Sequence, residues 1–258
     1  MTIEQLNKVM VYGTPELRKP PLDFFPRCSG CTHGLTGKAV MEVLDEMGLA
    51  GNAIFVVGIG CHSTLIMEMK LDIIQNAHGA SPSVATGVKH AHFGKKLVFT
   101  IQGDGDCAAI GAGYLMNAAF RAEKITVIMV NNSLYGTTGG QMAPTTLMGQ
   151  YTTTTPMLRQ PKHGYPAHLP ELLATIQGVA YTARAALNSP ANYQKAKKAI
   201  RTAFQKQMDG VGFTFVELLS LCPPNLRMTP VEAVKHMDDV VMAEYPLGEF
   251  KNVDKTEK

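Results

Sequence analysis

Five cysteines are the side chains of this sequence with the widest range of chemistry. Cys28 and Cys31 form a C-x-x-C pair in PRCSGCTHG, while Cys61, Cys107 and Cys222 are scattered along the chain. Such a pair can be a redox dithiol, half of a zinc site, half of an iron–sulfur site or two buried thiols. The C-x-x-C motif alone does not identify which of these sites is present, so the residues expected near it in the fold must be considered.

A run rich in glycine and aspartate, GDGDCAAIGAG, follows the apolar run KLVFTIQ. Gly103, Gly105 and Ala108 loosely fit the turn of a dinucleotide-binding domain, and Glu123 lies about where its ribose-binding acid is expected. However, the aspartates would face the pyrophosphate of a dinucleotide, and Glu123 precedes the next strand instead of ending it. A carboxylate such as that of Asp104 is favourable here if Mg²⁺ lies between it and phosphate oxygens.

The next apolar run, ITVIMV, leads directly into NNSLYG, and twenty-five residues separate GDG from NN. If the two runs are neighbouring parallel strands, Asp104 and Asn132 both lie at the carboxyl edge of the sheet, where such folds bind ligands. Two unrelated polar turns are the alternative, because GDG and NN are each common. The spacing, with a strand before each motif and a helix between them, favours the thiamine diphosphate (ThDP) binding signature.

The cysteines are expected at the same edge of the sheet. The C-x-x-C pair precedes a helix that leads into the strand IFVVG, Cys61 follows that strand, and Cys222 follows the strand FTFVELLS. Four thiols near a positive helix end, which stabilises thiolates, could hold a metal centre. Zinc and unligated thiols stay open, but one pair with two scattered cysteines favours a cubane iron–sulfur cluster. Cys107 is interpreted as a small packing residue.

Short apolar runs alternate with helical patterns along the chain. Strands are expected at residues 54–58, 96–102, 125–130 and 213–220, and helices at 34–48, 83–93, 107–121 and 190–208. Ser189 is a candidate cap for the last of these helices, and Thr229 begins a capping box for a closing helix. The alternation predicts an α/β fold, a mostly parallel sheet with helices on both faces, in a single domain over 1–258. Residues 133–168 are expected to form a long loop, and 246–258 a polar tail.

Composition and charge argue against several classes of function. The chain of 258 residues is 45% hydrophobic and 17% charged, and its net charge of +3 does not imply nucleic acid or a membrane surface. No apolar run approaches the roughly 20 residues of a membrane-spanning helix. The N-terminal residues lack the order of a signal peptide, so we expect a cytoplasmic protein with thiols or metal ligands instead of disulfides.

Together these motifs resemble one family, the β (ThDP-binding) subunits of 2-oxoacid:ferredoxin oxidoreductases. The resemblance covers roughly residues 24–236 and rests on CSGCTHG, GIGCHS, HGASPSVATGVKHA, GDGDCAAIG, NNSLYGTTGGQMAPTT and SLCPPN, in family order. It implies one 4Fe–4S cluster on Cys28, Cys31, Cys61 and Cys222, and Mg²⁺ on Asp104, Asn132 and the backbone carbonyl of Leu134. It implies a ThDP pocket lined by Gly60, Cys61, His62, His78, Gly103, Asp104, Gly105, Asp106, Asn132, Leu134 and Thr137.

The chain departs from the family pattern at three positions. Ala80 stands where relatives usually have arginine, which removes one cationic contact near the site. Gly139 stands where some relatives carry a lysine that faces the substrate, so a second carboxylate on the substrate is less directly recognised. Ser29 replaces a proline within the C-x-x-C pair and leaves the ligands unchanged.

The resemblance also implies an activity and partners. The family oxidatively decarboxylates a 2-oxo acid to acyl-CoA and CO₂, and passes the electrons through the 4Fe–4S cluster to ferredoxin. The glutamate that activates ThDP, and any further clusters, are expected on an alpha-type partner subunit, so no catalytic residue is assigned in this chain. The loop 133–168 is expected to cover the cofactor or pack on that partner, or else to be a mobile surface loop.

Other readings of the same residues stay open. A non-oxidative ThDP-dependent decarboxylase subunit would share the Mg²⁺ site without a cluster, and a zinc-stabilised binding module would bind no ThDP. His33 could tune the cluster or be an ordinary turn histidine. A basic helix face is interpreted as solvated, with docking of an acidic ferredoxin as the alternative. Its residues are Lys195, Lys197, Lys198, Arg201 and Lys206.

Overall fold

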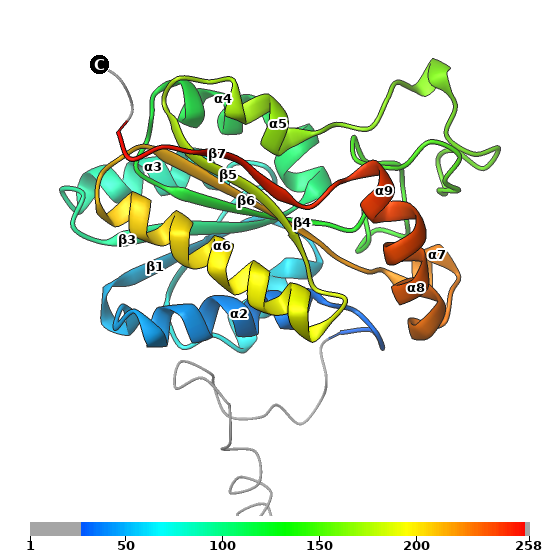
Figure 1. The fold of residues 1–258 in the computed structure, drawn as a ribbon, viewed down its shortest axis with the longest axis horizontal. Coiled ribbons are helices and arrows are strands. Elements are labelled where there is room, and N and C mark those ends of the chain that lie inside the picture. The colour runs from blue at the N-terminus through cyan, green and yellow to red at the C-terminus, as the bar shows by residue number, and fades with distance from the viewer. Residues whose placement is uncertain (1–26, 256–258) are drawn as a thin grey trace, which may run out of the picture.

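The structure, a computed structural model, describes residues 27–255. The expectations for residues 1–26 and 256–258 lie outside the described residues. Within them, one seven-stranded sheet has the order β2-β1-β3-β4-β6-β5-β7, in which only the β5–β7 pair is antiparallel (Figure 1). The strands are β1 Ala53–Val57, β2 Asp72–Gln75, β3 Leu97–Gly103, β4 Thr126–Asn131, β5 Val179–Ala186, β6 Phe213–Leu219 and β7 Gly248–Asn252.

Helices connect these strands. They are α2 His33–Glu46, α3 Ser81–Ala91, α4 Ala112–Phe120, α5 Leu169–Ala174, α6 Pro190–Met208, α7 Pro223–Leu226, α8 Pro230–His236 and α9 Met242–Glu244. Short 3₁₀ segments cover Ala50–Asn52, Cys61–Met67 and Pro161–His163, and π segments cover Asp106–Ile110 and Met237–Val241. Helices α2 and α6 cover one face of the sheet, and α3, α4 and α5 cover the other (Figure 1). The predicted fold class is therefore confirmed.

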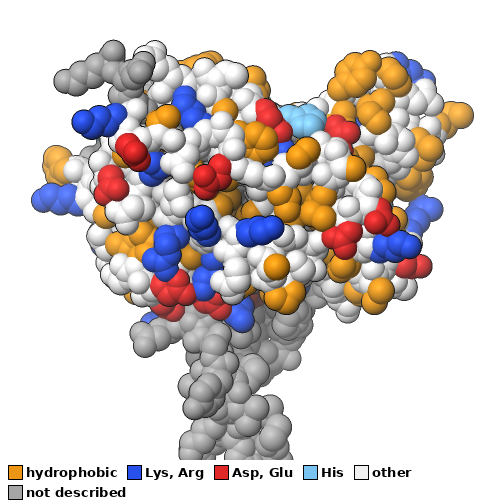
Figure 2. Space-filling view, viewed as in Figure 1, with side chains coloured by type: hydrophobic (Ala, Val, Ile, Leu, Met, Phe, Trp, Pro, Cys, Tyr) orange, Lys and Arg blue, Asp and Glu red, His pale blue; other side chains and the backbone are white. Residues whose placement is uncertain are grey.

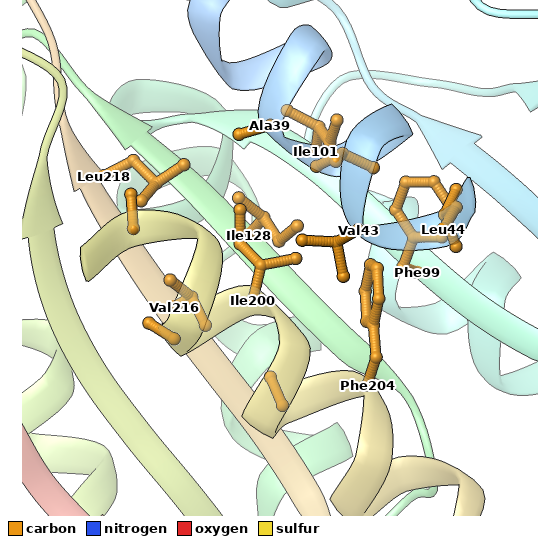
Figure 3. Close-up of a cluster of buried hydrophobic side chains, with 14 of the residues drawn as sticks. Ala39, Val43, Leu44, Phe99, Ile101, Ile128, Ile200, Phe204, Val216 and Leu218 are labelled. Carbon is orange, nitrogen blue, oxygen red and sulfur yellow. The ribbon is translucent and has the colours of Figure 1, made fainter. Parts of the chain in front are cut away.

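The central strands are continuous apolar runs because helices bury both of their faces. On the face of α2 and α6, Val43, Ile200 and Phe204 pack onto the sheet (Figure 3). There the ring of Phe99 stacks on that of Phe55, with 5.2 Å between the ring centroids. This packing holds β1 and β3 side by side, and the loops that follow these two strands build the site.

Both predicted helix caps are present. The Ser189 hydroxyl accepts a hydrogen bond from the Asn192 amide at 3.2 Å, and Thr229 forms the expected capping box with Glu232 at the start of α8. Caps of this kind satisfy amides that the first helical turn leaves without a partner.

The basic face of α6 is largely used within the molecule. Lys197 and Arg201 form ion pairs with Glu46 of α2, and the buried Lys206 contacts Asp254. Several basic side chains lie together over the region of α6, with acidic side chains next to them (Figure 2). Three of the five cations on this face thus have intramolecular partners.

Three strands were not predicted. Strand β5, VAYTARAA, contains four alanines and one arginine, which is a poor strand pattern by composition. Strand β2 is a mostly exposed edge strand. The expected polar tail is wrong for Gly248–Asn252, because β7 pairs with β5 through its backbone, which does not require apolar side chains.

The segment 133–168 has little regular structure, as expected, but much of it is packed against the domain. Thr145, Thr146 and Arg159 are buried there. The outer part of the segment projects from the sheet edge and carries apolar side chains on its surface (Figures 1 and 2). Met157 and Tyr165 are two exposed apolar residues of this segment.

Candidate functional site

The candidate site is a pocket at the carboxyl edge of the sheet. The chain leaves β1 for β2 on one side and then returns to β3 on the other side. The loops after β1 and β3 therefore diverge and leave a crevice between them. The strand ends are level there, since Gly103 pairs with Val130 and Asn131 pairs with Leu219.

An open hollow of about 520 Å³ occupies this crevice. Its lining contains the eleven residues predicted to bind the cofactor: Gly60, Cys61, His62, His78, Gly103, Asp104, Gly105, Asp106, Asn132, Leu134 and Thr137. It also contains residues that the sequence did not single out as lining: His33, Ile59, Tyr135, Gly136 and Thr138. The structure thus brings the predicted set together around one cavity.

Three polar groups converge at the ends of β3 and β4. One terminal atom of the Asn132 amide lies 3.3 Å from Asp104 Oδ1 and 2.7 Å from the carbonyl oxygen of Leu134. With nitrogen at that position the amide donates to both groups, whereas with oxygen three acceptors face one another and require a cation. Ligands at about 2.1 Å in octahedral geometry are about 2.9 Å apart, so the spacing fits Mg²⁺.

Asp104 is held in place on both of its oxygens. Oδ1 accepts the Gly105 amide at 2.9 Å, and Oδ2 accepts the hydroxyl of Thr145. Burial raises the pKa of Asp104 to about 7, although both of these hydrogen bonds favour the ionised form. The carboxylate charge is therefore costly in this position unless a cation lies beside it.

The two asparagines of NN, Asn131 and Asn132, have different structural roles. The Asn131 amide donates to Glu217 Oε1 at 2.6 Å and accepts the Ser133 amide at 2.9 Å. Ser133 has a left-handed φ of 62°, which is uncommon for a residue with a side chain. Asn131 thus shapes the turn. Asn132, the Leu134 carbonyl and Asp104 Oδ1 form the group of converging polar atoms that we call the oxygen site.

Asp106 organises the pocket wall. Its Oδ1 accepts the amide of Gly79 at 2.6 Å and the ring nitrogen of His78, and its Oδ2 accepts Gln102 Nε2 at 3.1 Å. Burial acts to raise the pKa of Asp106, but its histidine and amide partners outweigh burial and lower it. The second aspartate of GDGD therefore holds the His78 loop in place as an ionised acceptor.

Two glycines allow close backbone approach around this wall. Gly79 has a φ of 84°, and a Cβ there would lie 2.7 Å from the amide nitrogen of Gly111. A Cβ on Gly105 would overlap the ring of Tyr135, whose hydroxyl donates to the Gly105 carbonyl at 3.1 Å. Both positions require the absence of a side chain.

The predicted cysteines lie near one another, and one of them, Cys61, lines the pocket. A Cβ added to Gly136 would lie 3.3 Å from Cys61 Sγ and 3.8 Å from Cys222 Sγ, so the missing side chain leaves both sulfurs room. Cys31 and Cys28 lie in the turn before α2, where the Cys31 amide donates to the Cys28 carbonyl at 3.1 Å. Each of the half-buried thiols of Cys31 and Cys222 is close enough to two other cysteines for their charges to raise its pKa.

The helix end does not make these thiols acidic, contrary to expectation. Burial raises the pKa of Cys31 to about 11 and also raises that of Cys222. Desolvation outweighs the contacts that favour each thiolate, which come from His33 and Arg27 at Cys31 and from Asn225 at Cys222. Within residues 27–255, no group of three or more His, Cys, Asp or Glu side chains is spaced to hold one metal ion.

Two neighbours of the thiols give them polar contacts. Cys31 Sγ lies 3.3 Å from His33 Nδ1, and Asn225 Nδ2 donates to Cys222 Sγ at 3.2 Å. His33 is buried, and this burial lowers its pKa to about 3, so its ring is neutral. Cys107 is fully buried in the apolar core, which agrees with its interpretation as a packing residue.

Sequence reasoning missed a buried ionic network behind the site. Glu217 bonds Asn131 and Arg184, and Arg184 forms two further hydrogen bonds of 2.7 Å with Glu171. The only signal was the arginine and the glutamate inside otherwise apolar runs. Glu123, by contrast, bonds His90 and Arg121 before β4, away from the carboxyl edge, which excludes it as a ribose-binding acid.

The described residues contain no helix long and apolar enough to cross a membrane.

A doubly wound parallel sheet with an oxygen site at its switch point defines a cofactor-binding α/β domain. Residues 58–218 match the family described as thiamine pyrophosphate enzyme, C-terminal TPP binding domain. The ketoisovalerate oxidoreductase subunit VorA of Methanothermobacter thermautotrophicus is 40% identical over 226 residues, 87% of this chain and 47% of that protein. The 2-oxoglutarate synthase subunit KorB of Methanocaldococcus jannaschii is 30% identical over 94% of both chains.

The fold agrees with a solved structure, the 2-oxoglutarate:ferredoxin oxidoreductase from Magnetococcus marinus with 2-oxoglutarate, coenzyme A and succinyl-CoA bound. The TM-score is 0.75 at 23% identity, over 93% of this chain and 85% of that chain. The chain belongs to the family of thiamine-diphosphate-binding subunits of 2-oxoacid:ferredoxin oxidoreductases. It spans about half the length of the VorA proteins that it matches.

Proposed function

We propose that this chain is the β subunit of a 2-oxoacid:ferredoxin oxidoreductase, which converts a 2-oxo acid, coenzyme A and oxidised ferredoxin to acyl-CoA, CO₂ and reduced ferredoxin. The observation that carries this proposal is the convergence of Asp104, Asn132 and the Leu134 carbonyl beside the pocket. The thiols of Cys61 and Cys222 lie beside Gly136, which lines the same pocket.

The oxygen site fits a magnesium ion that anchors a diphosphate. Asp104, Asn132 and Leu134 would supply three of its ligands, and phosphate oxygens would supply others. His78, held by Asp106, would contact the diphosphate from the opposite wall. Bound ThDP supplies the carbanion chemistry of decarboxylation, while this chain binds and orients it.

The thiol group fits a 4Fe–4S cluster better than zinc. A tetrahedral zinc ion holds its sulfurs about 3.8 Å apart, and among residues 27–255 no three such ligands are spaced for one ion. A cubane places a separate iron under each sulfur and needs a wider spacing. We propose that Cys28, Cys31, Cys61 and Cys222 are its ligands, and a bound cluster would favour the thiolate forms that burial disfavours.

A partner subunit would complete the active site. The described residues form one sheet, which we propose is a single ThDP-binding domain. The glutamate that activates ThDP would come from an alpha-type subunit, as would the thiols of any further cluster. Segment 133–168 contributes Thr137 and Thr138 to the pocket lining, and we propose that its projecting part packs on that partner.

The pocket lining also favours a substrate class. Among the described residues that line the pocket, there is no lysine or arginine. Gly139, where some relatives have lysine, has a φ of 107° and no side chain to meet a second carboxylate. We therefore propose a 2-oxo acid with an apolar side chain as the preferred substrate.

Anaerobic co-purification with the native partner tests this function. We expect a brown complex with about four irons per β chain, and ferredoxin reduction that requires a 2-oxo acid, coenzyme A, ThDP and Mg²⁺. A panel of branched, aryl and dicarboxylic 2-oxo acids would test the substrate class. A colourless complex that releases an aldehyde would instead identify a non-oxidative decarboxylase, and failure to bind ThDP would refute the proposal.

A further inference from the structure

The turn at 143–146 is fixed through its backbone carbonyls by two buried side chains, Arg159 of the same segment and Tyr245 of the C-terminal part of the chain. The Arg159 guanidinium donates to the carbonyls of Pro144, at 3.0 Å, and Thr146. The Tyr245 hydroxyl donates to the Thr145 carbonyl at 2.7 Å. Arg159 is 4% exposed and Tyr245 is fully buried.

Arg159 also ties this turn to the next part of the chain. Its Nε donates to the carbonyl of Gly164 at 3.1 Å, and its Nη2 donates to that of Tyr165 at 2.8 Å. One planar guanidinium thus links two stretches of a segment that has little regular structure. Only an arginine presents donors in such a fork, and a lysine at this position would satisfy fewer carbonyls.

Tyr245 approaches the turn from the opposite end of the chain. It lies just after α9, in the apolar cluster that packs against the ends of β5 and β6. The guanidinium carbon of Arg184 lies 5.1 Å from the centre of its ring, and Arg184 Nη1 donates to the Pro246 carbonyl at 3.0 Å. The hydroxyl of Tyr245 therefore has a fixed position above the turn.

The turn presents one hydroxyl to Asp104 and a second hydroxyl to the loop that carries Leu134. Thr145 donates to Asp104 Oδ2, and Thr146 donates to the Ser133 carbonyl at 2.7 Å. With Oδ2 occupied by Thr145, Oδ1 of Asp104 is the oxygen that faces Asn132. The turn thereby sets which carboxylate oxygen is offered to a cation, and it also holds the loop that carries Leu134.

We propose that Arg159 and Tyr245 are positioning residues for the cation site, acting through Thr145 on the carboxylate of Asp104. This inference rests on the proposed function, because it concerns the magnesium ion that anchors ThDP. It assigns a role to residues outside the GDG and NN motifs and to the C-terminal part of the chain. Loss of either contact would loosen Asp104 without removing a ligand.

Binding of Mn²⁺ in place of Mg²⁺, followed by electron paramagnetic resonance with ThDP present, tests this inference on the complex with the native partner. Tyr245→Phe removes one hydroxyl and should raise the Kd for Mn²⁺ about threefold to tenfold, the range of one hydrogen bond. Tyr181→Phe is the matched control, since Tyr181 is equally buried and its hydroxyl bonds Glu249 at 2.8 Å, away from the turn. Its Kd should stay within about twofold of wild type, whatever stability it loses.

A second pair of variants acts directly at the carboxylate. Thr145→Val removes the donor to Asp104 and should raise the Kd about tenfold or more, because the hydrogen bond is to a charged group. Thr145→Ser keeps the hydroxyl and should restore binding. This pair tests the link from Thr145 to Asp104, on which the inference depends, and an unchanged Kd in Thr145→Val would refute the inference even if Tyr245→Phe does not give a folded complex.

The possible failures are distinguishable. Wild-type complex that does not bind Mn²⁺ with ThDP would refute the proposed function and this inference together. Wild-type binding with an unchanged Kd in Tyr245→Phe and Thr145→Val would refute the inference alone. An equal loss of affinity in Tyr181→Phe and Tyr245→Phe would also overturn it, because the effect would then be general destabilisation.

Discussion

Replacing Glu217 with glutamine removes the charge at the centre of the buried network behind the site while keeping the shape of the side chain. Glu217 and Arg184 are both buried. Glu217 Oε2 accepts Arg184 Nε at 2.6 Å, and Oε1 accepts Asn131 Nδ2 at 2.6 Å. Glutamine has only one acceptor, so its amide group would face a donor on one of the two sides.

The expected magnitude follows from the partners that remain. Removing one member of a buried ion pair costs about 3–5 kcal/mol. Glu171 still neutralises Arg184 through two hydrogen bonds of 2.7 Å, which places the loss at the lower end. We expect a loss of about 3 kcal/mol in the free energy of unfolding, and a fall in Tm of about 6–12 °C.

Thermal unfolding followed by circular dichroism measures this loss, and Glu46→Gln is the control. Glu46 makes a comparable change of charge at the surface, where its carboxylate is 45% exposed and pairs with Lys197. Its replacement should cost about 0.5 kcal/mol or less, because exposed ion pairs contribute little. If Glu217→Gln melted within about 2 °C of Glu46→Gln, the network would not hold the Asn131 turn as argued.

Three further predictions concern the thiols, the GDG turn and a buried lysine. Cys222→Ser should abolish cluster binding, whereas Cys107→Ser should keep about four irons per chain; equal iron in both would exclude Cys222 as a ligand. Gly105→Ala should destabilise the domain because the new Cβ overlaps a tyrosine ring, whereas Gly113→Ala, in open space on α4, should stabilise it by about 0.5–1 kcal/mol. Urea unfolding of the two variants would contradict this if their stabilities shifted in the same direction. Burial lowers the pKa of Lys89 to about 8. The unfolded chain therefore binds more protons at Lys89 between about pH 8 and 10.5, so the contribution of this residue to stability should rise through this range by about 3 kcal/mol. Lys89→Met should lack this rise, and an identical pH profile in both proteins would refute the burial argument.

The alternation of apolar runs with helical patterns was sufficient to predict the central strands of the sheet. The apolar runs ending at Gly103 and Asn131 are buried on both faces, and such strands have a continuous apolar composition. Strand β5 was missed because its alanines and Arg184 do not indicate a buried strand. Arg184 is tolerated there because Glu217 and Glu171, from other elements, compensate its charge.

The sequence by itself determined which side chains meet at one edge of the sheet. In a parallel sheet every strand ends at the same edge, so residues such as Asp104, Asn132 and Cys61 gather there whatever the order of the strands. Motifs and their spacing were therefore sufficient to predict that Asp104, Asn132 and the cysteines share this edge, whereas the family resemblance implied the other predicted pocket residues and only the structure added Ile59, Tyr135 and Gly136.

Only the tertiary structure decided how those side chains are oriented. The position of Asp104 depends on Thr145, which depends on Arg159 and Tyr245, and these contacts join segments far apart in the chain. The hydrophobic periodicity of the sequence does not predict such contacts. They depend on the path of an irregular segment and on how the C-terminal part of the chain packs against it. Residue type and spacing predict proximity, whereas the direction of each polar atom is set by packing of the whole domain.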